Sequence, residues 1–162
     1  IQYKTNYKCL MPTNTFGPND NYNALNSHFL PALIKKVHDL KLNNKKELTL
    51  WGNGLAKREV IYVDDLADAC IFFMKKSFSG TTLNIGTGKD FSIKQYAKII
   101  LNKIMPKNKI KIRYDLSKPN GTPRKVLDIK LANKYGWKPK TKLDEAITKT
   151  YKNFLENNKI AE

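Results

Sequence analysis

The stretch Trp51-Gly-Asn-Gly-Leu-Ala-Lys-Arg-Glu-Val-Ile-Tyr-Val-Asp-Asp65 decides the fold of this chain. Its glycines predict a tight turn after a strand over residues 47–51, and the β-branched residues that follow predict a second short strand over 59–63. Either Asp64 or Asp65 can cap the next helix, whose apolar residues recur at helical spacing. The unit is therefore strand, turn, strand and helix.

Outward from this stretch, short strands and amphipathic helices alternate along the chain. Further strands are expected near residues 7–11, 81–85 and 110–114. Helices are expected after Ser27 as N-cap, after the Ser92/Gln95 capping box, near residues 129–134 and from Thr141 onward. The segment 15–26, rich in Gly, Pro and Asn, is predicted to be a loop. This alternation predicts an α/β chain, whose 162 residues suffice for one compact core or two small lobes.

The formal net charge is +16, from 30 basic and 14 acidic residues. Such an excess of positive charge is compatible with a nucleic-acid partner. Nearly all of it is Lys, however, and proteins that recognise the edges of bases usually do so with Arg. We therefore expect a small anionic partner such as a nucleotide diphosphate, and no nucleic acid. A basic nucleotide- or RNA-binding module without catalysis stays as the alternative. No membrane partner is expected, because no apolar run approaches the roughly 20 residues that a spanning helix needs.

The two cysteines, Cys9 and Cys70, both lie in apolar stretches. This placement predicts buried free thiols in a reducing environment, and hence a cytoplasmic protein. The chain begins at Ile1 rather than Met and carries no signal peptide, so we expect it to be a piece of a longer protein.

Three side chains in separate stretches are candidates for one diphosphate-sugar cleft. An indole such as that of Trp51 can stack on a base, and the planar guanidinium of Arg58 matches phosphate oxygens. His28 follows a polar loop at a predicted helix start, where an imidazole suits acid/base work or a ligand contact. A half-buried Trp, a solvated Arg and a merely capping His are the plainer alternatives.

Other patterns are weaker. Asn84-Ile-Gly-Thr-Gly88 lacks the third glycine of a dinucleotide fingerprint, so it is interpreted as a strand-to-helix turn. Lys118, Arg124 and Lys125 flank a loop that either wraps phosphates or is simply solvated. His38 has no Cys or carboxylate at ligand spacing, which argues against a metal site.

Taken together, these segments resemble the carboxy-terminal half of the GDP-L-fucose synthase family, which belongs to the extended short-chain dehydrogenase/reductases. The matching strings are Met11-Pro-Thr-Asn-Thr-Phe-Gly-Pro-Asn-Asp-Asn21, Asn26-Ser-His28, Pro31-Ala-Leu-Ile34, Trp51-Gly-Asn-Gly54, Arg58-Glu59, Tyr62-Val-Asp-Asp65, Asn84-Ile-Gly-Thr-Gly88 and Ser117-Lys-Pro-Asn-Gly-Thr-Pro-Arg-Lys125 with Asp128. They follow in order along almost the whole chain.

The resemblance implies a Rossmann-type lobe with a doubly wound sheet and a smaller α/β substrate lobe. Residues 1–26 would end the nucleotide-binding lobe and hold the active-site loop. Residues 27–162 would form mainly the substrate lobe, with some segments returning to the Rossmann sheet. The family uses NADP(H), epimerises GDP-4-keto-6-deoxy-mannose and then reduces it to GDP-L-fucose; a GDP-keto-heptose substrate is equally compatible. Its members are usually homodimers.

The resemblance also assigns roles to individual residues. On the cofactor side it implies Pro12, Thr13, Asn14, Thr15 and His28. On the substrate side it implies Asn14, Lys36, Trp51, Arg58, Asn120 and Lys125. His28 would be the acid/base residue, Lys36 and Arg58 would hold the diphosphate, and Trp51 would pack against GDP. Asn120 is a departure, because relatives often carry Asp there.

The family's glycine-rich cofactor loop and its catalytic Ser, Cys and Tyr-x-x-x-Lys pair would precede the matched region. Tyr3 does not begin that pair, because Tyr7 stands where the Lys is required. We therefore expect the 162-residue polypeptide by itself not to turn over. Loss of NADPH absorbance on addition of a GDP-keto-sugar to the purified chain would contradict this expectation.

Overall fold

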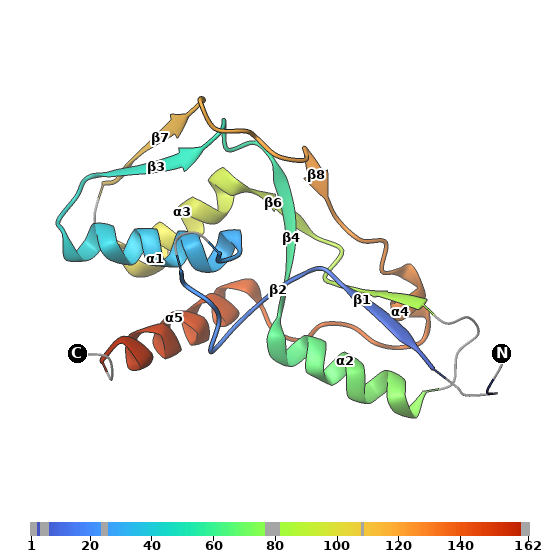
Figure 1. The fold of residues 1–162 in the computed structure, drawn as a ribbon. Helices are drawn as coiled ribbons and strands as arrows, with labels where there is room; N and C mark the ends of the chain where they lie inside the picture. The colour runs from blue at the N-terminus through green and yellow to red at the C-terminus, as the bar shows by residue number, and fades with distance from the viewer. Residues whose placement is uncertain (1–2, 4–6, 24–25, 77–81, 108, 160–162) are drawn as a thin grey trace.

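The computed structural model describes residues 3, 7–23, 26–76, 82–107 and 109–159 (Figure 1). Its elements are, in chain order, β1 (Cys9–Pro12), β2 (Asn14–Phe16), α1 (Phe29–Leu42), β3 (Glu47–Trp51), β4 (Lys57–Tyr62), α2 (Val63–Lys75), β5 (Thr82–Ile85), β6 (Asp90–Ser92), α3 (Ile93–Ile104), β7 (Lys111–Asp115), β8 (Arg124–Lys125), α4 (Lys130–Lys134) and α5 (Leu143–Lys159). The predicted α/β class is confirmed.

The strands form three small sheets, and most of their pairings are parallel. β1 pairs with β5, and β3 pairs with β7, each in parallel. β4 pairs in parallel with β2 and β8 and antiparallel with β6. Parallel neighbours need crossover connections, and here α1, α2 and α3 lie within the segments that supply them (Figure 1).

Two hydrophobic clusters lie on either side of β4. The first contains buried residues of α1, α3 and α5 together with β3, and the second contains residues of α2, β5 and α4 with Trp137. β4 contributes Val60 and Tyr62 to the first cluster and Ile61 to the second. Side chains alternate along a strand, so β4 is the wall shared by both cores.

Two expected helix starts are wrong. His28, not Ser27, is the N-cap of α1, and no side chain caps that helix. Tyr62 is the N-cap of α2, so Asp64 and Asp65 lie in its first turn, where the helix dipole also favours an acid. The Asp65 carboxylate instead accepts hydrogen bonds from the backbone amides of residues 140 and 141, just ahead of α5.

Two further expectations need correction. Residues 15–16 belong to strand β2 rather than to a loop, because they pair with β4. Residues 24–25 of the predicted loop and residue 81 of the predicted strand lie outside the described part of the chain.

Both cysteines are exposed rather than buried. Cys70 points away from the packed face of α2 that holds Ala69 and Phe73. None of the described helices is long and apolar enough to cross a bilayer.

The predicted capping box of α3 is confirmed and gives a stability test. Ser92 Oγ accepts from the Gln95 amide at 3.2 Å, and Gln95 Oε1 accepts from the Ser92 amide at 2.8 Å. We expect Ser92→Ala to lower the free energy of unfolding by about 1 kcal/mol. The Gln95 amide loses its acceptor, and the hydrogen bond that the Ser92 amide donates to the Gln95 side chain loses its reciprocal partner. Urea denaturation measures the change. Lys98→Ala, at an exposed position of the same helix, is the control, and equal midpoints for both variants would contradict the expectation.

Candidate functional site

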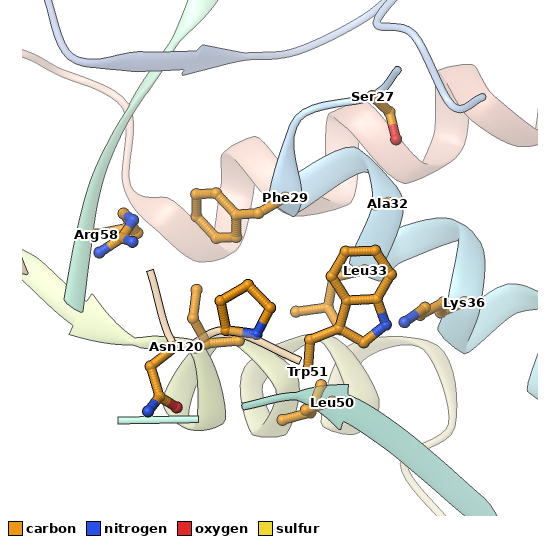
Figure 2. Close-up of a pocket in the computed structure, with 11 residues that line it drawn as sticks. Ser27, Phe29, Ala32, Leu33, Lys36, Leu50, Trp51, Arg58 and Asn120 are labelled. Atoms are coloured by element: carbon orange, nitrogen blue, oxygen red, sulfur yellow. The ribbon is translucent and has the colours of Figure 1, made fainter. Parts of the chain in front are cut away.

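A cleft of about 350 Å³ lies between α1, the end of β3 and the loop that follows β7 (Figure 2). Its floor is apolar and its rim carries polar and cationic side chains. The residues that line it are Ser27, Phe29, Ala32, Leu33, Lys36, Leu50, Trp51, Arg58, Ile93, Pro119 and Asn120. The volume and the mixture of apolar walls with few polar groups suit a small-molecule site.

Trp51 ends strand β3 and leaves 62% of its surface exposed, so its ring is available for stacking. The Lys36 ammonium lies 5.6 Å from the centre of the indole ring and 3.4 Å from the Thr49 carbonyl oxygen. The Lys118 ammonium lies 5.8 Å from the same ring centre. Burial lowers the pKa of Lys36, because desolvation disfavours the charged amine.

Arg58 is held in place by backbone oxygens. Its Nη1 donates to the carbonyl of Lys57 at 2.7 Å and to the carbonyl of Thr122 at 2.6 Å. Among the described residues no carboxylate pairs with this guanidinium, so its positive charge is not offset by a formal negative charge nearby. A guanidinium fixed through neutral partners keeps its attraction for phosphate.

Asn120 joins two loops of the cleft. Its Oδ1 accepts from the Asn53 amide at 2.7 Å, in the turn between β3 and β4. Gly52 in that turn has φ +64°, and a Cβ there would overlap Asn120 Oδ1. The glycine and the amide side chain therefore fit each other, and this contact fixes the loop beside Arg58.

Glu59 organises the other side of β4, and the sequence reasoning missed it. The side chain is fully buried, and Oε1 accepts from the amides of Thr87 at 2.6 Å and Gly88 at 2.7 Å. Oε2 accepts from the Leu127 amide at 2.7 Å. The sequence did contain a signal for it: side chains alternate along a strand, so an Arg58 that points outward predicts that its neighbour Glu59 points inward.

Residues 84–88 hold the end of β5 and the turn into the short strand β6, so this turn leads to a strand rather than directly to a helix as expected. The amides of Thr87 and Gly88 already donate to Glu59, so they are not free to hold a phosphate. Gly86 is required because a Cβ at that position would overlap Glu59 Oε1. The glycines thus make room for a carboxylate of the chain itself.

The expected cofactor-side residues lie apart from the cleft. Pro12, Thr13 and Asn14 line a separate hollow of about 320 Å³, together with Lys125. The Thr13 hydroxyl and the Asn14 amide both donate to the Glu59 carbonyl oxygen, at 3.2 and 2.8 Å. Thr15 does not line this hollow; its hydroxyl donates to the Thr13 carbonyl. Lys125 is the register partner of Arg58 across β4 and β8, yet its side chain faces this second hollow.

His28 does not line the cleft. Its neighbours Ser27 and Phe29 both line the cleft, whereas His28 is exposed and is not part of the wall. The structure therefore brings Lys36, Trp51, Arg58 and Asn120 together in one cleft, which His28 does not line.

Comparison with known proteins gives the family. The model of the NAD dependent epimerase/dehydratase family matches residues 1–86. The chain belongs to the NAD-dependent epimerase/dehydratase family.

Relatives within this family are similar over nearly the whole chain. The probable GDP-L-fucose synthase 1 of Oryza sativa is 42% identical over 157 residues, which cover 97% of this chain and 47% of that protein. The NADP-bound GDP-L-fucose synthetase of Naegleria fowleri superposes with a TM-score of 0.82 at 27% identity, covering 94% of this chain and 47% of that one. A GDP-6-OMe-4-keto-L-xylo-heptose reductase from C. jejuni gives a TM-score of 0.84 at 31% identity, covering 97% and 56%. This chain spans about half the length of the curated relatives it matches.

One spacing that resembles the Tyr-x-x-x-Lys pair of such enzymes does occur here. Tyr114 and Lys118 are separated by three residues, but Tyr114 lies in strand β7 and Lys118 in the turn after it. The pair needs one helix face to bring both side chains together. Tyr114 packs instead beside Lys94, and Lys118 lies over Trp51.

No group of three or more metal-ligating side chains occurs in the described part of the chain. His38 is explained by packing, since its Nδ1 lies 3.0 Å from the Tyr151 hydroxyl. Burial lowers the pKa of His38, which favours the neutral ring in this contact.

The buried Glu59 carboxylate predicts a large loss of stability on truncation. We expect Glu59→Ala to cost about 3 kcal/mol or more, because backbone donors at Thr87, Gly88 and Leu127 lose their acceptor inside the protein. Guanidinium denaturation measures the loss, and hydrogen exchange should show faster exchange at these three amides. The control is Glu156→Ala, at an exposed position of α5. A cost below about 0.5 kcal/mol, typical of surface positions, would contradict the expectation.

Proposed function

We propose that this chain forms the GDP-sugar-binding half of an NADP(H)-dependent epimerase/reductase. The proposed substrate is GDP-4-keto-6-deoxy-mannose, converted to GDP-L-fucose, or a close GDP-keto-heptose. The observation that carries the proposal is that Lys36, Trp51 and Arg58 share one cleft although they come from three separate elements. The relatives named above as GDP-L-fucose synthases and as a GDP-keto-heptose reductase support the same substrate class.

The cleft has the chemistry that a nucleotide diphosphate requires. The exposed indole of Trp51 offers a stacking surface for the base, and the Arg58 guanidinium offers parallel N–H donors for phosphate oxygens. Lys36 adds a second positive charge on the other side of the cleft (Figure 2). With the diphosphate held at these points, the sugar extends toward the rim.

His28, whose sequence neighbours Ser27 and Phe29 line the cleft, is the candidate for proton transfer. Epimerisation removes a proton from a carbon next to the ketone and returns it from the opposite face, which needs a group that titrates near neutrality. We propose that the His28 imidazole takes or gives this proton. Its exposed position beside Ser27 and Phe29 leaves room for a sugar above the cleft.

The hollow lined by Pro12, Thr13, Asn14 and Lys125 fits one wall of the cofactor site. Its uncharged backbone and amide groups suit a nicotinamide, and the Lys125 ammonium suits a phosphate. NADPH, when bound, supplies the hydride that reduces the ketone. The Thr13 and Asn14 side chains orient this wall through their bonds to the Glu59 carbonyl oxygen.

The lobe division belongs to the same proposal. Residues 1–26 would close the nucleotide-binding lobe, and β5 returns to pair with β1 as the division requires. Most of residues 27–162 would form the substrate lobe. A homodimer and a cytoplasmic location also stay part of the proposal; two free, exposed thiols are compatible with a reducing compartment.

Nucleotide binding tests the proposal. We expect the protein to bind GDP in preference to UDP, as measured by isothermal titration calorimetry. Arg58→Ala should weaken GDP binding by about 100-fold, because a bidentate charge-assisted contact is lost. Trp51→Ala should weaken it by about tenfold, which corresponds to the loss of one stacked base.

Arg113→Ala is the matched control, because this Arg pairs with Glu47 and does not line the cleft. It should leave GDP affinity within about twofold. Equal binding of GDP and UDP, or a wild-type protein that prefers oligonucleotides with a steep salt dependence, would contradict the proposal and favour a basic RNA-binding module.

A further inference from the structure

A third cation, Lys118, lies over the ring of Trp51 and has no role in the function proposed above. We propose that Lys118 binds the acceptor edge of the base stacked on Trp51, and so makes the site select a 6-oxopurine. This inference rests on the proposed function, since it needs a nucleotide in the cleft. Lys118 directly precedes Pro119 and Asn120, which line the cleft.

The backbone around Lys118 is fixed by Asp115. Trp51 and Asp115 are register partners of β3 and β7, so the turn after β7 begins beside the indole. Asp115 Oδ1 accepts from the Ser117 hydroxyl at 2.6 Å and from its amide at 3.1 Å, and the Lys118 amide donates to the Asp115 carbonyl at 3.2 Å. These hydrogen bonds, with a smaller contribution from the Lys118 charge, lower the pKa of Asp115 and keep it an acceptor.

The position of the Lys118 ammonium, 5.8 Å from the ring centre, is that of a cation–π contact. A base that stacks on the exposed indole would therefore have an edge within reach of this ammonium. Arg58 lines the part of the cleft away from Trp51 in Figure 2, where the diphosphate can lie. The Lys36 ammonium also lies over this ring, but it already donates to the Thr49 carbonyl oxygen. Lys118 is therefore the lysine placed for the base, and Arg58 is placed for the phosphates.

The chemistry of a lysine decides which base is favoured. An ammonium has three donors and no acceptor, so it binds best to a base edge that carries acceptors. Guanine and hypoxanthine present O6 and N7 together, whereas adenine presents an amino donor beside N7. A lysine at this edge therefore binds the oxo bases more tightly than adenine.

A comparison of three nucleotides tests the proposal. Lys118→Met keeps the apolar stem on Trp51 and removes the charge; the position is exposed, so folding should be unaffected, which thermal unfolding checks. By calorimetry, we expect this variant to bind GDP and IDP about tenfold more weakly than wild type, and ADP within about twofold. Lys152→Met, at an exposed position of α5, is the charge-matched control and should change none of the three affinities.

Two results would overturn the proposal. An equal loss for ADP, GDP and IDP would mean that Lys118 contacts phosphate and not the base. Unchanged GDP affinity would mean that it contacts neither. If in that case Arg58→Ala still weakens GDP binding, the proposed function stands while the role of Lys118 falls; a wild-type protein that binds no GDP contradicts both.

Discussion

The structure depends on one buried carboxylate. Glu59 is fully enclosed, and its two oxygens accept backbone amides from the turn after β5 and from the segment after β8. An ionised group in an apolar interior is costly unless each oxygen is hydrogen-bonded, so these segments must close around it together. The Glu59 backbone carbonyl extends the network, because Thr13 and Asn14 bind it. One residue thus connects β4, the turn at Gly86 and the expected cofactor wall.

The neighbour of Glu59 connects that network to the cleft. Arg58 and Glu59 point to opposite sides of β4, because side chains alternate along a strand. β4 therefore presents the Glu59 side chain to the buried hydrogen-bond network and the Arg58 side chain to the cleft. Tyr96, buried behind the cleft, donates its hydroxyl to the Arg58 carbonyl at 2.9 Å and so fixes the same peptide from the core side. Burial raises the pKa of Tyr96, which keeps this hydroxyl a donor.

Much of the fold followed from local patterns. The strand over 47–51, the glycine turn after it and the Ser92 capping box are confirmed, because each depends on neighbours within a few residues. The cap assigned to Asp64 or Asp65 was wrong for the opposite reason. Asp65 finds its donors at residues 140–141, and no local pattern reveals a partner so far along the chain. Cys70 was predicted to be buried because its neighbours in the sequence are apolar, but it lies on an exposed face of its helix.

The sequence by itself determined the α/β class, most of the helices and strands and the candidate residues Trp51 and Arg58, because periodicity, turn chemistry and side-chain type are local properties; Lys36 came from the family resemblance. The tertiary structure decided how these residues are grouped. It placed Lys36, Trp51 and Arg58 in one cleft, left His28 outside the cleft wall, and placed Lys125 in a second hollow with Pro12 and Asn14. It also revealed Glu59 and the position of Lys118, since both depend on segments that meet only when the parallel strands pair across long connections.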